Sequence, residues 1–138
     1  MESLFMQEHE KWLNIAKYDL KVAKGLQSLE FFTAVVYHCQ QAAEKALKGY
    51  LVFKGREVTK THDLIKLLDL CILLDGEFIK KGDAASFLNP LSTKFRYPSD
   101  FIIPDCEDAD ITIKHASSII RFVIKKIAEP DTGQKNIF

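Results

Sequence analysis

The sequence predicts an all-α protein, built as an up-and-down antiparallel bundle of four long helices with one further short or kinked helix. Apolar residues recur at spacings of three and four along most of the chain, which is the periodicity of amphipathic helices. No stretch alternates apolar and polar residues as a strand does, and no repeat has the period of a solenoid. The connections between the long helices are short, which favours antiparallel neighbours.

The first two helices are predicted from apolar stripes. The first covers about residues 7–29 and ends where Ser28-Leu29-Glu30 interrupts its stripe, which consists of Trp12, Ile15, Ala16, Ala23 and Leu26. The stripe of the second helix is nearly unbroken and consists of Phe32, Val35, Val36, Cys39, Ala42, Ala43, Ala46, Leu47 and Tyr50. Gly55 is predicted to end the second helix, because glycine adopts the left-handed conformation that follows many helices.

The third helix is predicted from the segment "TKTHDLIKLLDLCILL" and runs to about Leu74. Thr61 is expected to be its N-cap, because a hydroxyl accepts hydrogen bonds from the free backbone N–H groups of the first turn. Asp63 then places a negative charge near the positive end of the helix dipole.

The fourth helix begins near Asp83 and is predicted to be kinked or in two pieces. Pro90 removes one backbone donor and disfavours helical geometry at Asn89. The following segment, "RYPSDFIIPDCEDADI", contains Pro98 and Pro104, which favour extended chain, so we expect a surface loop of functional length.

The last helix is predicted to begin near Glu107. Its stripe consists of Ala109, Ile113, Ala116, Ile120, Val123 and Ile127. We interpret residues 1–129 as a single helical domain and residues 130–138, which follow the last helix, as a disordered tail.

Composition limits the classes of function. The chain has 138 residues, enough for one domain, and its 47% apolar and 28% charged residues are typical of a globular protein. Nineteen basic and nineteen acidic residues cancel, so any site for an anion must be local. The sequence shows no signal peptide and no apolar run that would span a bilayer, so we expect a cytoplasmic protein without membrane contact.

The sequence predicts no metal, cofactor or disulfide. Cys39, Cys71 and Cys106 are odd in number, far apart and set among apolar neighbours, and we interpret all three as core residues. His9 and His115 stand apart, and no two histidines have the spacing of metal ligands. A glycine-rich phosphate loop is also missing.

One side of the second helix carries a ridge of polar side chains. Its residues, which we call the polar ridge, are His38, Gln41, Lys45 and Lys48, at intervals of three, four and three. Such a ridge is typical of the solvated face of a core helix. It is equally the arrangement of a binding surface or of a dimer interface.

Two further segments could bind anions. His62-Asp63 opens the third helix, where free N–H groups and the helix dipole attract negative charge, although capping alone also explains these residues. Lys54, Arg56 and Lys60 add positive charge near the end of the second helix.

Arg96-Tyr97-Pro98 combines a planar cation, an aromatic ring and a rigid proline. This combination suits a phosphate or a nucleobase. In the alternative, Arg96 caps the end of the fourth helix and Tyr97 packs into the core.

Four motifs occur together and in order: Trp12 with Asp19-Leu20, then "HCQQAAEKALKGYL", "THDL" and "RYP". In this combination the chain resembles the HEPN family, the higher-eukaryote and prokaryote nucleotide-binding domains, over about Glu8 to Lys126. The resemblance implies a helical bundle that is commonly a homodimer. It also implies a partner, a minimal nucleotidyltransferase, with which the domain forms a toxin–antitoxin-like pair.

Many members of that family are metal-independent RNases, in which an Arg followed after four to six residues by a His acts across the dimer. This sequence departs from that pattern, because the first histidine after Arg96 is His115. Arg56 and His62 match the spacing, but they lie in the loop after the second helix rather than near the end of the third or fourth. We interpret that match as a coincidence.

The sequence therefore predicts a HEPN protein that binds a nucleotide or RNA and works with a nucleotidyltransferase. The predicted binding residues are His38, Gln41, Lys45, Lys48, His62, Asp63, Arg96 and Tyr97. Lys45 and Arg96 would contact phosphate, and Tyr97 would stack on a base. One alternative is a metal-independent endoribonuclease toxin using His38 or His62 with Arg96 or Arg56. A second is a structural dimerisation module whose interface is the polar ridge.

Overall fold

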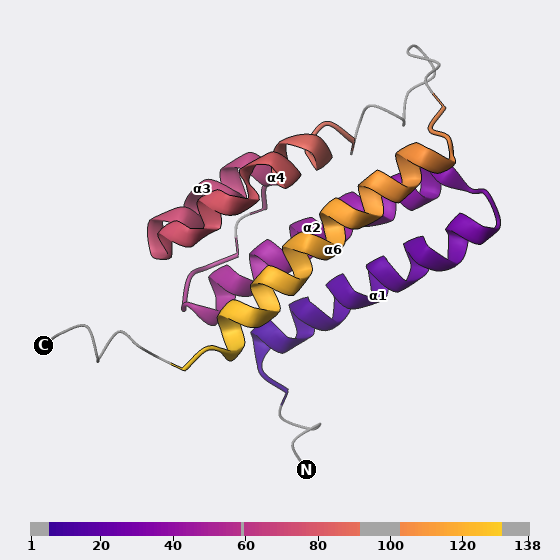
Figure 1. Ribbon diagram of the computed structural model, residues 1–138. Coiled ribbons are helices and arrows are strands. Elements are labelled where there is room, and N and C mark those ends of the chain that lie inside the picture. Colours follow the sequence, from indigo (N-terminus) through magenta and orange to yellow (C-terminus); the bar gives the residue numbers. More distant parts are fainter. Residues whose placement is uncertain (1–5, 59, 92–102, 131–138) are drawn as a thin grey trace, which may run out of the picture.

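Three long helices lie side by side in the computed structural model, which describes residues 6–58, 60–91 and 103–130 (Figure 1). They are α1 (Glu8–Ser28), α2 (Phe32–Phe53) and α6 (Cys106–Ala128). The shorter elements α3 (Leu64–Leu74), the 3-10 helix η2 (Gly76–Lys81) and α4 (Gly82–Leu88) pack together against α2 and α6. The described residues contain helices and no strands, so the predicted all-α bundle is confirmed.

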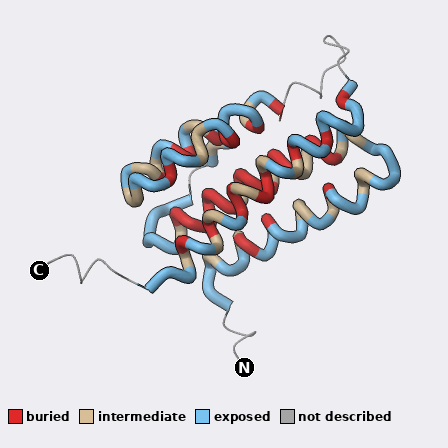
Figure 2. The backbone as a smooth tube through the Cα atoms, in the orientation of Figure 1, coloured by how far each residue is buried: buried red, intermediate tan, exposed pale blue. Residues whose placement is uncertain are grey.

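Helix α2 is the centre of the molecule. It contacts α1, α6, α3 and α4, and 13 of its 22 residues are buried. Figure 2 shows the buried residues gathered along α2 and on the faces that the neighbouring helices turn toward it. Because α2 has neighbours on most of its circumference, polar residues on it are also enclosed, namely Gln40, Glu44 and Lys48.

Helices α1 and α2 approach closely where a glycine faces a tryptophan. A Cβ atom added to Gly49 would lie 3.2 Å from Cβ of Trp12 and 3.5 Å from the backbone oxygen of His9. Buried alanines line both helices, namely Ala16, Ala23, Ala42, Ala43 and Ala46. Small side chains therefore set the short separation of these two helices.

The start of α3 differs from the prediction that Thr61 is its N-cap. The N-cap is Asp63, whose carboxylate accepts hydrogen bonds from the backbone N–H groups of Ile65 and Lys66 at 2.9 and 3.3 Å. The Thr61 hydroxyl instead accepts from the backbone N–H of Asp63 at 3.1 Å. An aspartate at this position both caps the helix and complements its dipole, so Asp63 performs the capping role predicted for Thr61 as well as its own.

The helix predicted to be kinked or in two pieces is interrupted at Pro90: α4 stops at Leu88, Asn89 and Pro90 form a turn, and Leu91 is helical again. Asn89 then ties this end to the start of α3. Its side-chain oxygen accepts from the backbone N–H of Leu64 at 2.8 Å, and its amide donates to Asp63 at 3.1 Å. The 3-10 helix η2 before α4 was not predicted.

The remaining helix predictions agree with the structure to within about two residues. Gly55 has a left-handed φ of 78° just after α2, as expected for a glycine that ends a helix. Cys39 and Cys71 are buried, but the prediction for Cys106 was wrong: it is exposed, because it is the first residue of α6. The predicted loop residue Pro98 and residues 131–138 of the predicted tail lie outside the described residues.

Candidate functional site

The polar ridge follows the side of α2 that meets α1 and the loop between α2 and α3, and its residues differ greatly in exposure. The side chains of His38 and Lys45 are 30% and 22% exposed, whereas that of Lys48 is 6% exposed. The ridge is therefore not a uniformly solvated face.

Lys48 belongs to a network around a buried carboxylate, which we call the Glu44 network: Glu44, Lys48 and His62. The Glu44 side chain is 1% exposed, and its Oε2 atom accepts from Lys48 Nζ at 2.9 Å and lies 3.0 Å from His62 Nδ1. Lys48 Nζ also lies 5.8 Å from the ring centre of Trp12, within reach of a cation–π contact. A carboxylate so enclosed needs these partners to offset its lost hydration.

A second network joins α1 to α2, and we call it the Asp19 network: Asp19, His38, Gln41 and Lys45. The two oxygens of Asp19 lie 3.0 Å from His38 Nδ1 and 3.9 Å from Lys45 Nζ. Lys45 also donates to the Gln41 side-chain oxygen at 3.1 Å. Like the Glu44 network, it groups one carboxylate, one lysine and one histidine.

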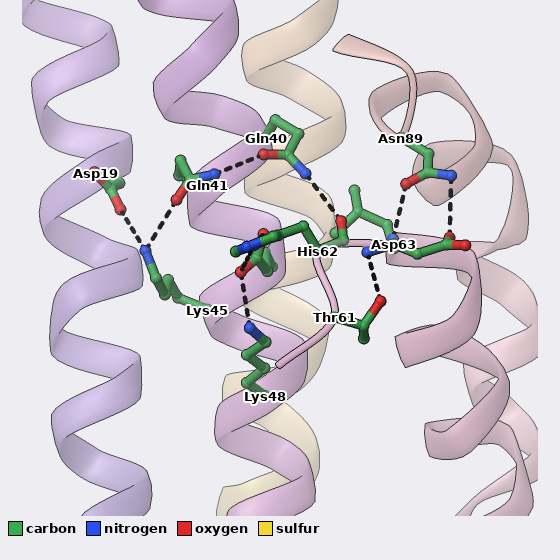
Figure 3. A network of polar contacts seen from close by, with 11 residues as sticks. Asp19, Gln40, Gln41, Lys45, Lys48, Thr61, His62, Asp63 and Asn89 are labelled. Carbon is green, nitrogen blue, oxygen red and sulfur yellow. Dashed lines mark hydrogen bonds and ion pairs between the residues drawn. The ribbon is translucent and has the colours of Figure 1, made fainter. Parts of the chain in front are cut away.

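Gln40 connects the two networks. Its side-chain oxygen accepts from the Gln41 amide at 2.9 Å, and its own amide donates to the backbone oxygen of His62 at 3.5 Å. Figure 3 shows Asp19, Lys45, Gln41, Gln40 and His62 joined by dashed lines, with the His62 ring reaching from the loop across the face of α2. Polar atoms from α1, α2 and the following loop thus form one connected group, in which Gln40 and Glu44 are buried.

Glu44 and Gln40 were missed by the sequence analysis. They lie in the segment "QQAAEKALKG", where polar residues alternate with buried alanines. The four-residue spacing of Glu44 and Lys48 was a usable signal, because oppositely charged side chains at that spacing pair on a helix. In the sequence, Asp19 is singled out only by the family resemblance.

Asp63, another predicted binding residue, caps the start of α3 in the structure. The backbone N–H groups of Leu64, Ile65 and Lys66 are taken by the side chains of Asn89 and Asp63. These donors are therefore not free for an outside anion. The geometry gives Asp63 a capping role and leaves His62 as the residue of this pair that faces the networks.

Two predicted binding residues lie outside the described residues, and three further residues that the sequence analysis considered stand apart from the networks. Arg96 and Tyr97 lie outside the described residues. Arg56 is exposed and lines a hollow of about 220 Å³ with Leu51 and Leu70. His9 and His115 pack against the rings of Phe53 and Phe87, at centroid distances of 4.9 and 4.6 Å.

The described residues contain no group of three or more metal-ligating side chains, and no helix among them is long and apolar enough to cross a membrane. Burial raises the pKa of the Cys39 and Cys71 thiols to about 12, which makes them poor nucleophiles. A hollow of about 730 Å³ at the corner between α1 and α2 is lined mainly by apolar side chains, among them Phe31 and Ile103. Of the predicted binding residues that the structure describes, all but Asp63 belong to the two networks.

Comparison with known proteins agrees with this architecture. The family model described as "HEPN domain" matches residues 9–127. The crystal structure of TT1696 from Thermus thermophilus is similar, with 27% identity, a TM-score of 0.73, and coverage of 88% of this chain and 99% of that one. The crystal structure of ST0689, an archaeal HEPN homologue, has 30% identity, a TM-score of 0.70 and the same two coverages. No curated protein matches the chain.

Proposed function

The chain belongs to the HEPN domain family, and on that premise we propose that it binds a nucleotide or RNA on the surface formed by the Asp19 and Glu44 networks. One observation carries the proposal: the buried Gln40 joins the two networks, so that the partly exposed Lys45 and His62 belong to one hydrogen-bonded group. A cation for phosphate and an exposed imidazole are side chains that nucleotide sites use.

The exposed fractions of the Lys45 and Lys48 side chains indicate different roles for the two residues. Lys48 is 6% exposed and satisfies the buried Glu44, so its role is to stabilise the site. Lys45 is 22% exposed and lies 3.9 Å from Asp19. Lys45 Nζ donates to Gln41 at 3.1 Å, and its longer ion pair with Asp19 leaves donor capacity for a phosphate, so Lys45 is the phosphate contact. His38 and Gln41 hold Lys45 and Asp19 in place and supply further hydrogen bonds.

The family also suggests how the domain works. HEPN proteins are often dimers, and the resemblance implies a toxin–antitoxin-like pair with a minimal nucleotidyltransferase. We include a homodimer and that partner in the proposal, and co-purification of the two proteins expressed together tests the partnership.

Binding of a labelled single-stranded RNA to the wild type and to Lys45→Ala tests the proposal. Loss of one charged hydrogen bond weakens affinity by about tenfold or more, and it reduces the slope of log affinity against log salt by about 0.7. Lys114→Ala is the matched control, because Lys114 is exposed on α6. Equal affinities of the wild type and Lys45→Ala would remove Lys45 from the site.

The Glu44–His62 contact favours one second candidate, a metal-independent endoribonuclease. A histidine whose Nδ1 is held by a carboxylate is oriented as a general base. Incubation with structured RNA in EDTA tests it, and cleavage to 2′,3′-cyclic phosphate ends that is lost in His62→Ala and in Arg96→Ala is the expected sign. Intact RNA leaves binding as the function.

A further inference from the structure

Helix α1 lies at an edge of the bundle and leaves most of its surface to solvent. It packs against α2 and α6 on one side (Figure 1), and only three of its 21 residues are buried. Figure 2 shows α1 as exposed over most of its length. An exposed helix face indicates a partner only where its side chains differ from those of a plain solvated surface.

A second apolar stripe runs along the outer side of α1. Its residues, which we call the outer stripe, follow one another at intervals of three, four and seven, and are Ile15, Tyr18, Val22 and Leu29. Such intervals place side chains on one side of a helix. Ile15, Tyr18 and Leu29 are 47%, 67% and 62% exposed. Single exposed apolar residues are ordinary, but an aligned row of them is the pattern by which one helix docks on another.

Gly25 lies in the same row, three residues after Val22 and four before Leu29. A Cβ atom added to Gly25 would meet no described atom within 4 Å, so packing within the described chain does not require the glycine. Glycine weakens a helix relative to alanine. At Gly49 the missing side chain lets α1 approach α2 closely, and Gly25 offers the same close approach to a helix from outside the chain.

A row of lysines borders the outer stripe. We call Lys17, Lys21 and Lys24 the lysine row. Lys21 lies three residues after Tyr18 and four before Gly25, so the lysine row runs beside the outer stripe. All three lysines are exposed, and none of them forms an ion pair with a described residue. The outer side of α1 therefore combines apolar side chains with unpaired positive charge.

The unpaired lysines indicate which occupant fits this face. Contact between the α1 helices of two copies would bring two lysine rows together, and Asp19, the one carboxylate of α1 after Glu10, is already held in the Asp19 network. An anionic membrane would attract the lysines but would not explain Gly25, because lipid needs no close approach to the helix backbone. A helix with acidic residues beside its own apolar stripe matches the charge, the stripe and the glycine together.

We propose that the outer side of α1 is a docking site for an amphipathic helix of a partner protein, and that acidic residues flank the apolar stripe of that helix. The partner's apolar side chains cover the outer stripe, its backbone approaches Gly25, and its carboxylates pair with the lysine row. The inference does not depend on the proposed function, because no residue of the outer stripe or the lysine row belongs to the Asp19 or Glu44 network.

Binding of designed helical peptides to the full chain tests the inference. The probe peptide has leucines at intervals of three and four, bordered by glutamates. One control peptide has lysines in place of the glutamates, and the other has serines in place of the leucines. Fluorescence anisotropy should show that the probe binds about tenfold more tightly than either control. Absence of binding, or a probe that binds no more tightly than its controls, would overturn the proposal.

Variants of the chain locate the contact. Leu29→Ser should weaken binding of the probe about tenfold, because a buried leucine contact is lost. Its control is Leu73→Ser, at a leucine of α3 that is 82% exposed. Glutamine at all three positions of the lysine row should reduce the preference for the probe over the lysine peptide, whereas Lys114→Gln on α6 should not. Equal effects in the variants and their controls would overturn the assignment to α1.

The Gly25→Gln variant separates docking from stability. Glutamine favours a helix more than glycine does, so this variant should melt at a higher temperature than the wild type in circular dichroism. Its longer side chain should nevertheless hold the partner helix away and weaken binding of the probe about tenfold. Undiminished binding would overturn the close approach at Gly25.

Two further measurements test the other occupants. Sedimentation equilibrium of the wild type and Gly25→Gln tests a second copy, and cosedimentation with vesicles of phosphatidylcholine and phosphatidylglycerol tests a membrane. We expect Gly25→Gln to leave the oligomeric state unchanged and the vesicles to leave the protein in solution. A dimer that dissociates in Gly25→Gln, or vesicle binding that is lost in Leu29→Ser, would assign the face to that occupant and overturn the proposal.

Discussion

Two buried lysines in the described chain, Lys48 and Lys126, are both 6% exposed at the side chain, yet they serve opposite kinds of network. Lys48 pairs with one carboxylate that is itself 1% exposed. Lys126 contacts a set that we call the Lys126 network, in which its partners are Asp75, Glu77 and Glu129. Those three carboxylates are 26%, 54% and 42% exposed.

The difference lies in which charge is enclosed. In the Lys126 network the lysine is enclosed and its carboxylates reach water, so the network fastens the last turns of α6 to the corner between α3 and η2. In the Glu44 network both charges are enclosed, and the group that reaches water is the His62 ring. In the Glu44 network, the buried ion pair of Glu44 and Lys48 thus holds an exposed side chain, the His62 ring, in position.

The largest expected effect comes from removing Lys48. Lys48→Met leaves the Glu44 carboxylate enclosed without its counter-charge, which should lower the free energy of unfolding by roughly 3–5 kcal/mol. Urea denaturation followed by circular dichroism measures it. The double variant Glu44→Leu with Lys48→Met should recover most of the loss, since a buried ion pair is often replaced by apolar residues at little cost. A double variant as unstable as Lys48→Met would contradict this account.

A smaller loss is expected from Lys126→Met. Its three carboxylates can regain hydration, so the free energy of unfolding should fall by about 1–2 kcal/mol. The same urea titration measures it. A loss equal to that of Lys48→Met would mean that enclosure of the carboxylate is not what distinguishes the two networks.

The smallest expected effect is on the pH dependence of the free energy of unfolding in acid, and it arises from the Lys126 network. Burial alone would raise the Asp75 pKa, but hydrogen bonds from Lys126 and from the Glu77 backbone N–H, with the charge of Lys126, lower it below its ordinary value. The Glu77 pKa is also lowered, first by its hydrogen bond from Lys126 and then by that charge.

The sign of this effect follows from the unfolded chain, in which both carboxylates have their ordinary pKa. They take up protons at a higher pH when unfolded, so their contribution is complete above the ordinary pKa and is lost as pH falls through the lowered values. Unfolding free energies measured between roughly pH 6 and pH 2 should therefore fall less steeply in Lys126→Met than in the wild type. Parallel curves would contradict the prediction.

The helices could be predicted because each apolar stripe is a local pattern. The apolar stripes that contain Trp12, Cys39 and Ile120 form helices in the structure. The ends of these helices lie within about two residues of the predicted ends. Local pattern also explains the errors. Thr61 and Asp63 are both good caps, and choosing between them depends on Asn89, which lies 26 residues beyond Asp63.

The networks could be predicted only in part, because burial depends on neighbours that the sequence of one helix does not show. Lys48 and Lys45 have similar positions in the ridge pattern, yet the loop carrying His62 and the ring of Trp12 lie beside Lys48. The contact between Glu44 and His62 joins residues 18 positions apart, across a turn whose path no local spacing determines. The predicted roles of Arg96 and Tyr97 stay predictions.

The close approach of α1 and α2 at Gly49 has a consequence for how the protein tolerates mutation. Aspartate has one of the shortest charged side chains, and Asp19 reaches His38 across the gap between helices at 3.0 Å because that gap is narrow. A methyl group at Gly49 would lie 3.2 Å from Cβ of Trp12, so α1 would have to shift away from α2 by a few tenths of an ångström, which would strain that contact without altering a polar atom. In a saturation mutagenesis screen for ligand binding, the small residues between α1 and α2 should therefore be as intolerant as the charged ones.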